Sequence, residues 1–344
     1  MIQPKNIVPV LFSLALYFSG VLVFFTPIPL VFLLLKNQKK IFWVSQGLIL
    51  LGLMILYFFG VPWLQTIYAA NPWMGWLVIV PGIELSGFVS QNSIAVYGLF
   101  YYLFWVACAV VLSRAYLLKD GWFRIFYKGI LGSALAAILI FCALGYVNKV
   151  DPIHFLQSFF QTVIRDFVAT QEAGPLSLEQ KTWLKQYEGD LINLFVLLTP
   201  SFLFSSILFL YILNFTFAKR FLFSIKPEVL LARGNTWQAP FLWVWGVIFF
   251  LALFLIHIFY LSNPILKAIS LNGLLITAVV YFWQGIAIVS YFFQTKALGS
   301  FMRLMGYVLF FIFFEVLGPG LILFGFADAW LNIRKRIVPF SPKS

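Results

Sequence analysis

The stretch FFEVLGPGLILFGFADAWLNIRKR, residues 313–336, decides the class of fold. An acid, Glu315, lies inside an almost wholly apolar run that ends in three bases, Arg334, Lys335 and Arg336. A transmembrane helix needs roughly 20 mainly apolar residues to cross the hydrocarbon core of a bilayer. Basic residues typically follow such helices on the cytoplasmic side. The stretch therefore predicts a membrane-spanning helix with a basic lipid anchor at its end.

The composition of the whole chain supports the same class. Apolar residues make up 62% of the 344 residues and charged residues 10%, whereas an average soluble domain has about 25% charged residues. A soluble fold of this length cannot bury so much apolar surface, so a lipid bilayer must be the solvent. The apolar runs are continuous, which excludes the alternating pattern of a membrane β-barrel. The sequence predicts an all-α, polytopic helical membrane protein.

The apolar segments suggest about 8–10 transmembrane crossings in two bundles. Two segments are weak: 27–35 is short, and 73–90 contains a proline, a glycine and an acid that favour a kinked or partly re-entrant helix. The predicted segments are 7–25, 27–35, 41–60, 73–90, 95–113, 128–146, 191–217, 240–262, 268–293 and 304–331.

A polar insert divides the two predicted bundles. Its apolar residues Leu156, Phe160, Val163 and Phe167 recur at helical spacing, which predicts an amphipathic helix on the membrane surface. The sequence SLEQ at 177–180 predicts a capping box at a helix start. The predicted domains are an N-terminal bundle (1–146), the insert (147–190), a C-terminal bundle (191–332) and a basic tail (333–344).

The net charge of +12 indicates an interaction with anionic lipid and does not indicate nucleic-acid binding. The bases form short clusters between apolar runs, where they would anchor helix ends against anionic lipid. We therefore expect the lipid bilayer as partner and no nucleic acid. The clusters in short loops favour a multi-pass protein of the cytoplasmic (inner) membrane with both termini in the cytoplasm. If residues 73–90 do not cross the membrane, the alternative is a C-terminus on the outer side.

Glu315 is the sharpest candidate for function. A carboxylate in mid-membrane costs roughly 2.5–3.5 kcal/mol, so it needs a partner, a water-filled cavity or a proton. It would either act in a proton relay or ligand contact, or be protonated and hold a neighbouring helix. The following Gly318, Pro319 and Gly320 predict a helix break, which either lines a site or is a packing kink.

A partly polar stripe on 268–293 is the second candidate. Thr277, Tyr281 and Gln284 share one helix face, with Asn272 about a third of a turn away. Together with Glu315 these residues form a candidate ligand or proton site. The alternative is that they form interhelical hydrogen bonds, each worth roughly 0.6–2 kcal/mol.

The sequence contains none of the usual catalytic or nucleotide-binding motifs. There is no H-E-x-x-H, no P-loop and no G-x-S-x-G, and neither His154 nor His257 has neighbours at ligand spacing. We expect no enzymatic activity, no cofactor and no metal. Any transport would draw its energy from an ion gradient or another subunit.

Three stretches in the C-terminal half carry a resemblance to a known family. LNFTFAKRFL (213–222), LNGLLITAVVYFWQGIAIVSYF (271–292) and GFADAWLNIRKR (325–336) resemble the YybS-like family of predicted bacterial membrane proteins. The last helix of that family typically ends in a glycine, an aspartate and an Asp-Phe-Arg-Lys stretch, whose Asp-Phe is here Asn332-Ile333. The family implies no established activity.

The N-terminal half is similar to the substrate-binding S components of energy-coupling-factor transporters. TPIPLVFLLLK would be their short second helix and VPGIELSGFV their kinked fourth. This resemblance implies a six-helix, ligand-binding-like bundle, in which Ala15 and Ser19 would face a partner membrane subunit. The leading hypothesis is thus a small-molecule binding or transport component without its own ATPase. The alternative is a structural or assembly protein with no ligand.

Overall fold

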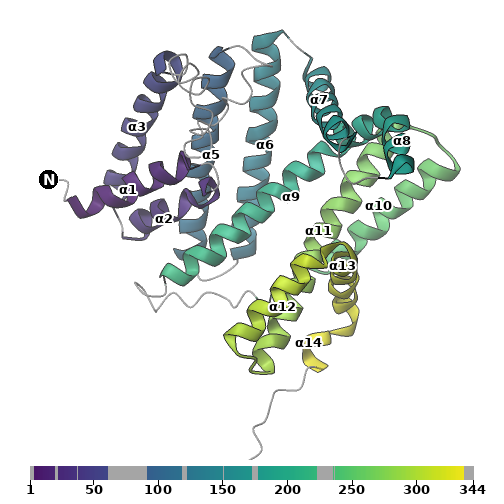
Figure 1. Ribbon diagram of the computed structural model, residues 1–344. Coiled ribbons are helices and arrows are strands. Elements are labelled where there is room, and N and C mark those ends of the chain that lie inside the picture. The colour runs from purple at the N-terminus through teal and green to yellow at the C-terminus, as the bar shows by residue number, and fades with distance from the viewer. Residues whose placement is uncertain are drawn as a thin grey trace, which may run out of the picture. The chain divides into compact units, whose positions relative to one another are not determined.

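The structure is a computed structural model that describes residues 4–19, 22–36, 38–60, 91–117, 122–149, 151–172, 177–222, 235 and 237–336. All regular elements in these ranges are helices (Figure 1). Six of them are long and apolar enough to cross a membrane: Lys39–Gly60, Ala95–Tyr116, Glu188–Ala218, Leu242–Phe259, Pro264–Thr295 and Phe314–Leu331. The predicted all-α, polytopic membrane class is confirmed. The predicted segment 73–90 lies outside the described residues.

The described helices extend from residue 4 to residue 336. In chain order they are α1 (Pro4–Tyr17), η1 (Val23–Phe25), α2 (Pro27–Leu35), α3 (Lys39–Ile55), η2 (Leu56–Gly60), α5 (Gln91–Leu117), α6 (Trp122–Asn148), α7 (Pro152–Glu172), α8 (Leu178–Gln186), α9 (Glu188–Leu222), α10 (Leu242–Phe259), α11 (Pro264–Thr295), α12 (Ser300–Ile312), α13 (Phe314–Leu331) and α14 (Ile333–Arg336).

The chain forms two compact units. Unit 1 comprises Met1–Val196 and Ser206–Leu230, and unit 2 comprises Leu197–Ser205 and Leu231–Ser344. The division between the two units therefore runs through α9. The reason is that α9 is one continuous helix of 35 residues, whose successive parts pack into different units.

Buried tyrosines connect the helices of unit 1. The Tyr17 hydroxyl donates a hydrogen bond to the Gly98 carbonyl oxygen at 2.8 Å and lies 3.1 Å from the Tyr57 hydroxyl. The Tyr102 hydroxyl donates to Gln46 Oε1 at 2.7 Å. In a bilayer such polar groups find no water, so they must satisfy one another. These bonds join α1, η2, α3 and α5.

The polar insert folds into two helices, α7 and α8. The predicted capping box at the start of α8 is confirmed: Gln180 N donates to Ser177 Oγ at 3.3 Å, and Ser177 N donates to Gln180 Oε1 at 3.0 Å. A single non-helical residue, Tyr187, separates α8 from α9. Arg165 on α7 donates from Nε to Glu188 Oε1 on α9 at 3.1 Å.

The last apolar segment, predicted as 304–331, is two helices. The interruption falls at Phe313, between α12 and α13, and α13 continues through Gly318-Pro319-Gly320. The break predicted at these three residues is therefore wrong in position. Proline crowds the carbonyl four residues before it and leaves that carbonyl without a donor. For Pro319 this carbonyl belongs to Glu315, so the disturbance lies close to the observed interruption.

Candidate functional site

Asp328 is the centre of a buried polar cluster in unit 2. Its side chain lies near the end of α13 and is almost completely inaccessible to solvent. Oδ2 accepts a hydrogen bond from Gln284 Nε2 at 3.2 Å and lies 3.6 Å from Arg334 Nη2. Oδ1 accepts from the backbone N–H of Ile333 at 2.8 Å. Two hydrogen bonds and a nearby guanidinium thus surround the carboxylate and offset the cost of its burial.

The chain reverses at Asn332 to bring these donors back to Asp328. Asn332 ends α13 in the left-handed conformation, with φ 45° and ψ 52°. Asparagine is one of the few residues other than glycine that tolerates this conformation, and it often ends helices in this way. The Asn332-Ile333 pair, where the resembling family has Asp-Phe, thus turns the chain so that Ile333 and Arg334 face Asp328.

Gln284 links three segments through one side chain. It is fully buried on α11. While its Nε2 donates to Asp328, its Oε1 accepts a hydrogen bond from the backbone N–H of Ala239 at 3.0 Å. Ala239 precedes α10, so Gln284 joins α11, α13 and the segment that leads into α10. This arrangement uses both ends of the amide within the protein.

Two glycines bring α11 and α13 together at this place. A Cβ atom on Gly285 would overlap the Leu321 carbonyl oxygen, and one on Gly325 would overlap the Tyr281 carbonyl oxygen. The paired residues run in opposite order along the two helices, so the helices are antiparallel. Small residues permit such close backbone contact in membrane helices. The contact sets Gln284 and Asp328 within hydrogen-bonding distance.

The other residues of the predicted stripe have separate roles. Thr277 Oγ1 donates to carbonyls of its own helix, at 3.0 Å to Gly273 and 2.9 Å to Leu274. The buried Tyr281 packs edge-on against Phe326, with ring centroids 5.1 Å apart, and its hydroxyl has no hydrogen-bond partner among the described residues. Thr277 and Tyr281 are therefore buried on α11, as Gln284 is.

Asn272 lies on the same helix and bridges α11 to α9. Its Oδ1 accepts from Ser201 N at 2.9 Å, and its Nδ2 donates to the Leu197 carbonyl oxygen at 2.8 Å. Ser201 N–H and Leu197 C=O are the two groups that a regular helix would pair with each other. The amide thus binds α9 beside Pro200, which lies inside that helix.

Glu315 is not part of this cluster. It is exposed in the first turn of α13, between the exposed apolar side chains of Phe314 and Val316. Thirteen residues separate it from Asp328, which on a helix corresponds to roughly 20 Å. The structure therefore brings Gln284 together with Asp328, an acid that the sequence analysis left out of the candidate set, and not with Glu315.

The three bases of the predicted lipid anchor, Arg334, Lys335 and Arg336, do not share one environment. Lys335 and Arg336 are exposed on α14, as a lipid anchor requires, whereas the Arg334 side chain is only 13% exposed and faces Asp328. Burial lowers the pKa of the Arg334 guanidinium, and the Asp328 charge acts in the opposite direction. Arg334 therefore belongs to the buried cluster.

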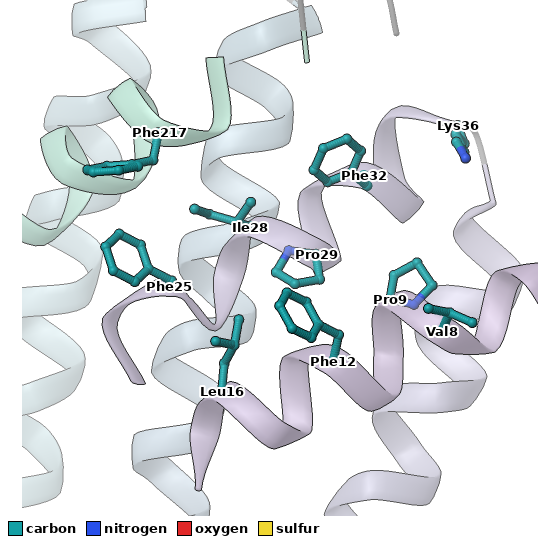
Figure 2. A pocket seen from close by; sticks show the side chains of 10 residues that line it. All are labelled: Val8, Pro9, Phe12, Leu16, Phe25, Ile28, Pro29, Phe32, Lys36 and Phe217. Carbon is teal, nitrogen blue, oxygen red and sulfur yellow. The ribbon is translucent and has the colours of Figure 1, made fainter. Parts of the chain in front are cut away.

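Unit 1 contains a cavity of about 440 Å³ that the sequence analysis did not predict. We call it the N-terminal groove. Figure 2 shows that its lining side chains come from α1, η1 and α2, with one from α9. The lining residues are Val8, Pro9, Phe12, Leu16, Phe25, Ile28, Pro29, Phe32, Lys36 and Phe217. Nothing in the sequence pairs Phe217 with residues near position 25, and the short, proline-containing segment 27–35 was the only signal.

Specific contacts fix the walls of the N-terminal groove. Ser13 Oγ on α1 donates to the Thr26 carbonyl oxygen at 2.9 Å. Asn214 Nδ2 on α9 donates to the Phe24 carbonyl oxygen at 2.7 Å, and the rings of Phe25 and Phe217 lie 5.0 Å apart. The helix α2, most of whose residues are buried, also packs against α5. The groove is therefore bounded by packed helices and held by hydrogen bonds.

Lysines cluster at one end of the groove. Lys36 ends α2, and Lys39 and Lys40 begin α3; all three side chains are exposed. In the part of the chain that the structure describes, no carboxylate forms an ion pair with Lys36. No group of three or more His, Cys, Asp or Glu side chains that could hold a metal ion is present among the same residues. Among the described residues, the groove thus offers an apolar wall and one cation without an ion-pair partner.

The fold and the composition define an integral membrane protein with several spanning helices. The chain belongs to the family of predicted membrane proteins DUF2232, whose profile matches residues 41–329. This match confirms the family resemblance of the C-terminal half. It begins after α1 and α2, so most of the N-terminal groove precedes it. Nothing among curated proteins or solved structures matches the chain.

Proposed function

We propose that this protein is a membrane-embedded binding component for a small lipophilic or amphiphilic molecule, which it holds in the N-terminal groove. The observation that carries the proposal is the cavity of about 440 Å³ with one charged residue among its ten lining residues. Ligand pockets typically measure about 300–1,000 Å³ and are mainly apolar with a few polar groups that orient the ligand. Because the sequence lacks a P-loop, a transport step would require an ion gradient or a partner membrane subunit.

A structural role is the second candidate, and the Asp328 cluster favours it for unit 2. Gln284 uses both ends of its amide within the protein, and the glycine contact leaves no space between α11 and α13. These features hold α11 to α13 and to the segment before α10. Under this alternative the protein binds no small molecule, and the N-terminal groove retains none after purification.

Photolabelling separates the two candidates. The full chain, purified in detergent, is irradiated with a long-chain alcohol that carries a diazirine, and labelled peptides are identified by mass spectrometry. We expect labelling of α1 and α2 that falls at least severalfold in Ile28→Trp, because the indole would occupy the groove. Leu48→Trp is the control, since Leu48 is 64% exposed on α3 and does not line the groove.

Two outcomes would contradict the proposal. One is equal labelling of all exposed apolar helices, and the other is labelling of α1 and α2 that Ile28→Trp leaves unchanged. Gel filtration and circular dichroism establish that the variant is folded. If Ile28→Trp does not fold, Val8→Trp replaces it, because Val8 lines the groove but is 63% exposed and tolerates a larger side chain.

A further inference from the structure

We infer that the ligand of the N-terminal groove is an anionic phospholipid of the bilayer, with one acyl chain between α1 and α2 and its phosphate at Lys36. The inference rests on the proposed function and specifies its ligand. Three observations support it: the lateral opening of the groove, the position of Lys36, and the distribution of charge in the first 60 residues.

The groove is open on the side formed by α1. Val8 and Phe12, which line it from α1, are 63% and 58% exposed. Figure 2 shows the apolar side chains following one another between α1 and α2, from Phe217 at one end to Lys36 at the other. In a membrane such a surface faces lipid, so an acyl chain can enter sideways while its head group remains at the bilayer surface.

Lys36 lies where the head group of that lipid would be. It follows the last turn of α2, and only the short connection to α3 separates it from Lys39 and Lys40. Basic residues between two apolar helices mark the level of the lipid head groups. A lysine ammonium is a compact charge that binds phosphate well and that carries three donors. Lys36 alone among the three also lines the groove.

The surrounding charges favour an anion. Residues 1–60 contain Lys5, Lys36, Lys39 and Lys40 but neither aspartate nor glutamate. Each lysine or arginine near an anionic membrane surface strengthens the attraction to that surface. A zwitterionic head group also carries a cation, which the same lysines repel, so its electrostatic attraction to them is weaker than that of an anionic head group. The groove should therefore select phosphatidylglycerol over phosphatidylcholine with the same chains.

The test counts bound lipids on the full chain by native mass spectrometry. Protein in mixed detergent micelles is supplied with dioleoylphosphatidylglycerol, dioleoylphosphatidylcholine or oleic acid at equal concentration. We expect one tightly held phosphatidylglycerol that is lost in Ile28→Trp, and about tenfold weaker retention in Lys36→Gln. Lys128→Gln removes an exposed lysine of α6 that does not line the groove and should retain the lipid as the unaltered chain does.

The remaining outcomes distinguish the ligand from the function. If both phospholipids are held equally and both are lost in Ile28→Trp, the groove binds a ligand but the anionic class is wrong. If oleic acid is held in preference to phosphatidylglycerol, the source is a free fatty acid and the phospholipid assignment is overturned. If Ile28→Trp changes no lipid count while the variant is folded, the proposed function itself fails.

Discussion

Gly285 on α11 and Gly325 on α13 meet backbone to backbone. A Cβ atom on Gly325 would lie 2.8 Å from the Gly285 backbone nitrogen, closer than van der Waals contact permits. The two helices can cross at this separation only because neither residue has a side chain. Gln284 and Asp328, which lie next to this crossing, reach each other across it at 3.2 Å.

Gly325→Ala should destabilise unit 2. The added methyl group meets the Tyr281 carbonyl oxygen and the Gly285 backbone, and neither can rotate away. We expect a loss of about 1–3 kcal/mol in the free energy of unfolding and a lower Tm in detergent. Gly320→Ala is the control on the same helix, because its methyl group would meet nothing within 4 Å. Equal Tm values for the two variants would contradict the close crossing.

Asp328→Asn should also destabilise the fold, since it removes the charge that faces Arg334 and one acceptor of the cluster. Hydrogen bonds to charged groups contribute about 1.5–3 kcal/mol, so a loss of this order is expected in denaturant unfolding. The measurement is a double-mutant cycle with Arg334→Gln. The double variant should lose less than the two single losses added together, by about 0.5–3 kcal/mol. Strict additivity would show that the 3.6 Å pair contributes nothing.

Asn272→Leu should weaken the attachment of α11 to α9. The substitution leaves Ser201 N–H and Leu197 C=O without the amide that now bridges them. Interhelical hydrogen bonds in membranes contribute about 0.6 kcal/mol on average and up to about 1.7 kcal/mol. In a Pro200→Ala background the helix can pair these two groups itself, so the cost of Asn272→Leu should fall. An unchanged cost would show that the bridge does not depend on the proline.

Glu315→Gln should leave the free energy of unfolding within about 0.5 kcal/mol of its original value, as for other exposed positions. It should also leave phosphatidylglycerol retention unchanged, because Glu315 belongs to unit 2 and does not line the groove. Native mass spectrometry and Tm measure both. If this variant, but not Ile28→Trp, abolishes ligand retention, the ligand site would lie at Glu315 and not in the N-terminal groove.

Composition and local patterns predicted the class and some local structure. The proportion of apolar residues predicts that the protein lies in a lipid bilayer. In hydrocarbon, a continuous apolar run must form a helix because its backbone polar groups can then bond with one another. The capping box at Ser177 is also local, because its two hydrogen bonds span four residues. The sequence predicted a break at 318–320, whereas the observed interruption lies at Phe313. A proline disturbs the helical turn before it, which places the disturbance of Pro319 near Glu315.

The site residues depend on contacts between distant parts of the chain. The hydrogen bond between Asp328 and Gln284 joins residues 44 positions apart and requires the glycine crossing. The N-terminal groove requires Phe217 to reach Phe25, and no sequence pattern specifies that pairing. Glu315 was predicted as a functional residue because a buried acid is costly. The spacing of residues along a helix does not determine whether another helix packs over the face that carries Glu315.

The length of α9 has a consequence for the insert that precedes it. Thirty-five residues make a helix of roughly 52 Å, and the hydrocarbon core is only about 30 Å thick. The acidic first turn, with Glu188 and Asp190, therefore stands in water, and so does the bond between Glu188 and the 63% exposed Arg165. Ionic strength screens such pairs, with a Debye length of about 3 Å at 1 M. Concentrated salt should accordingly loosen α7 from α9 while the turns within hydrocarbon stay intact.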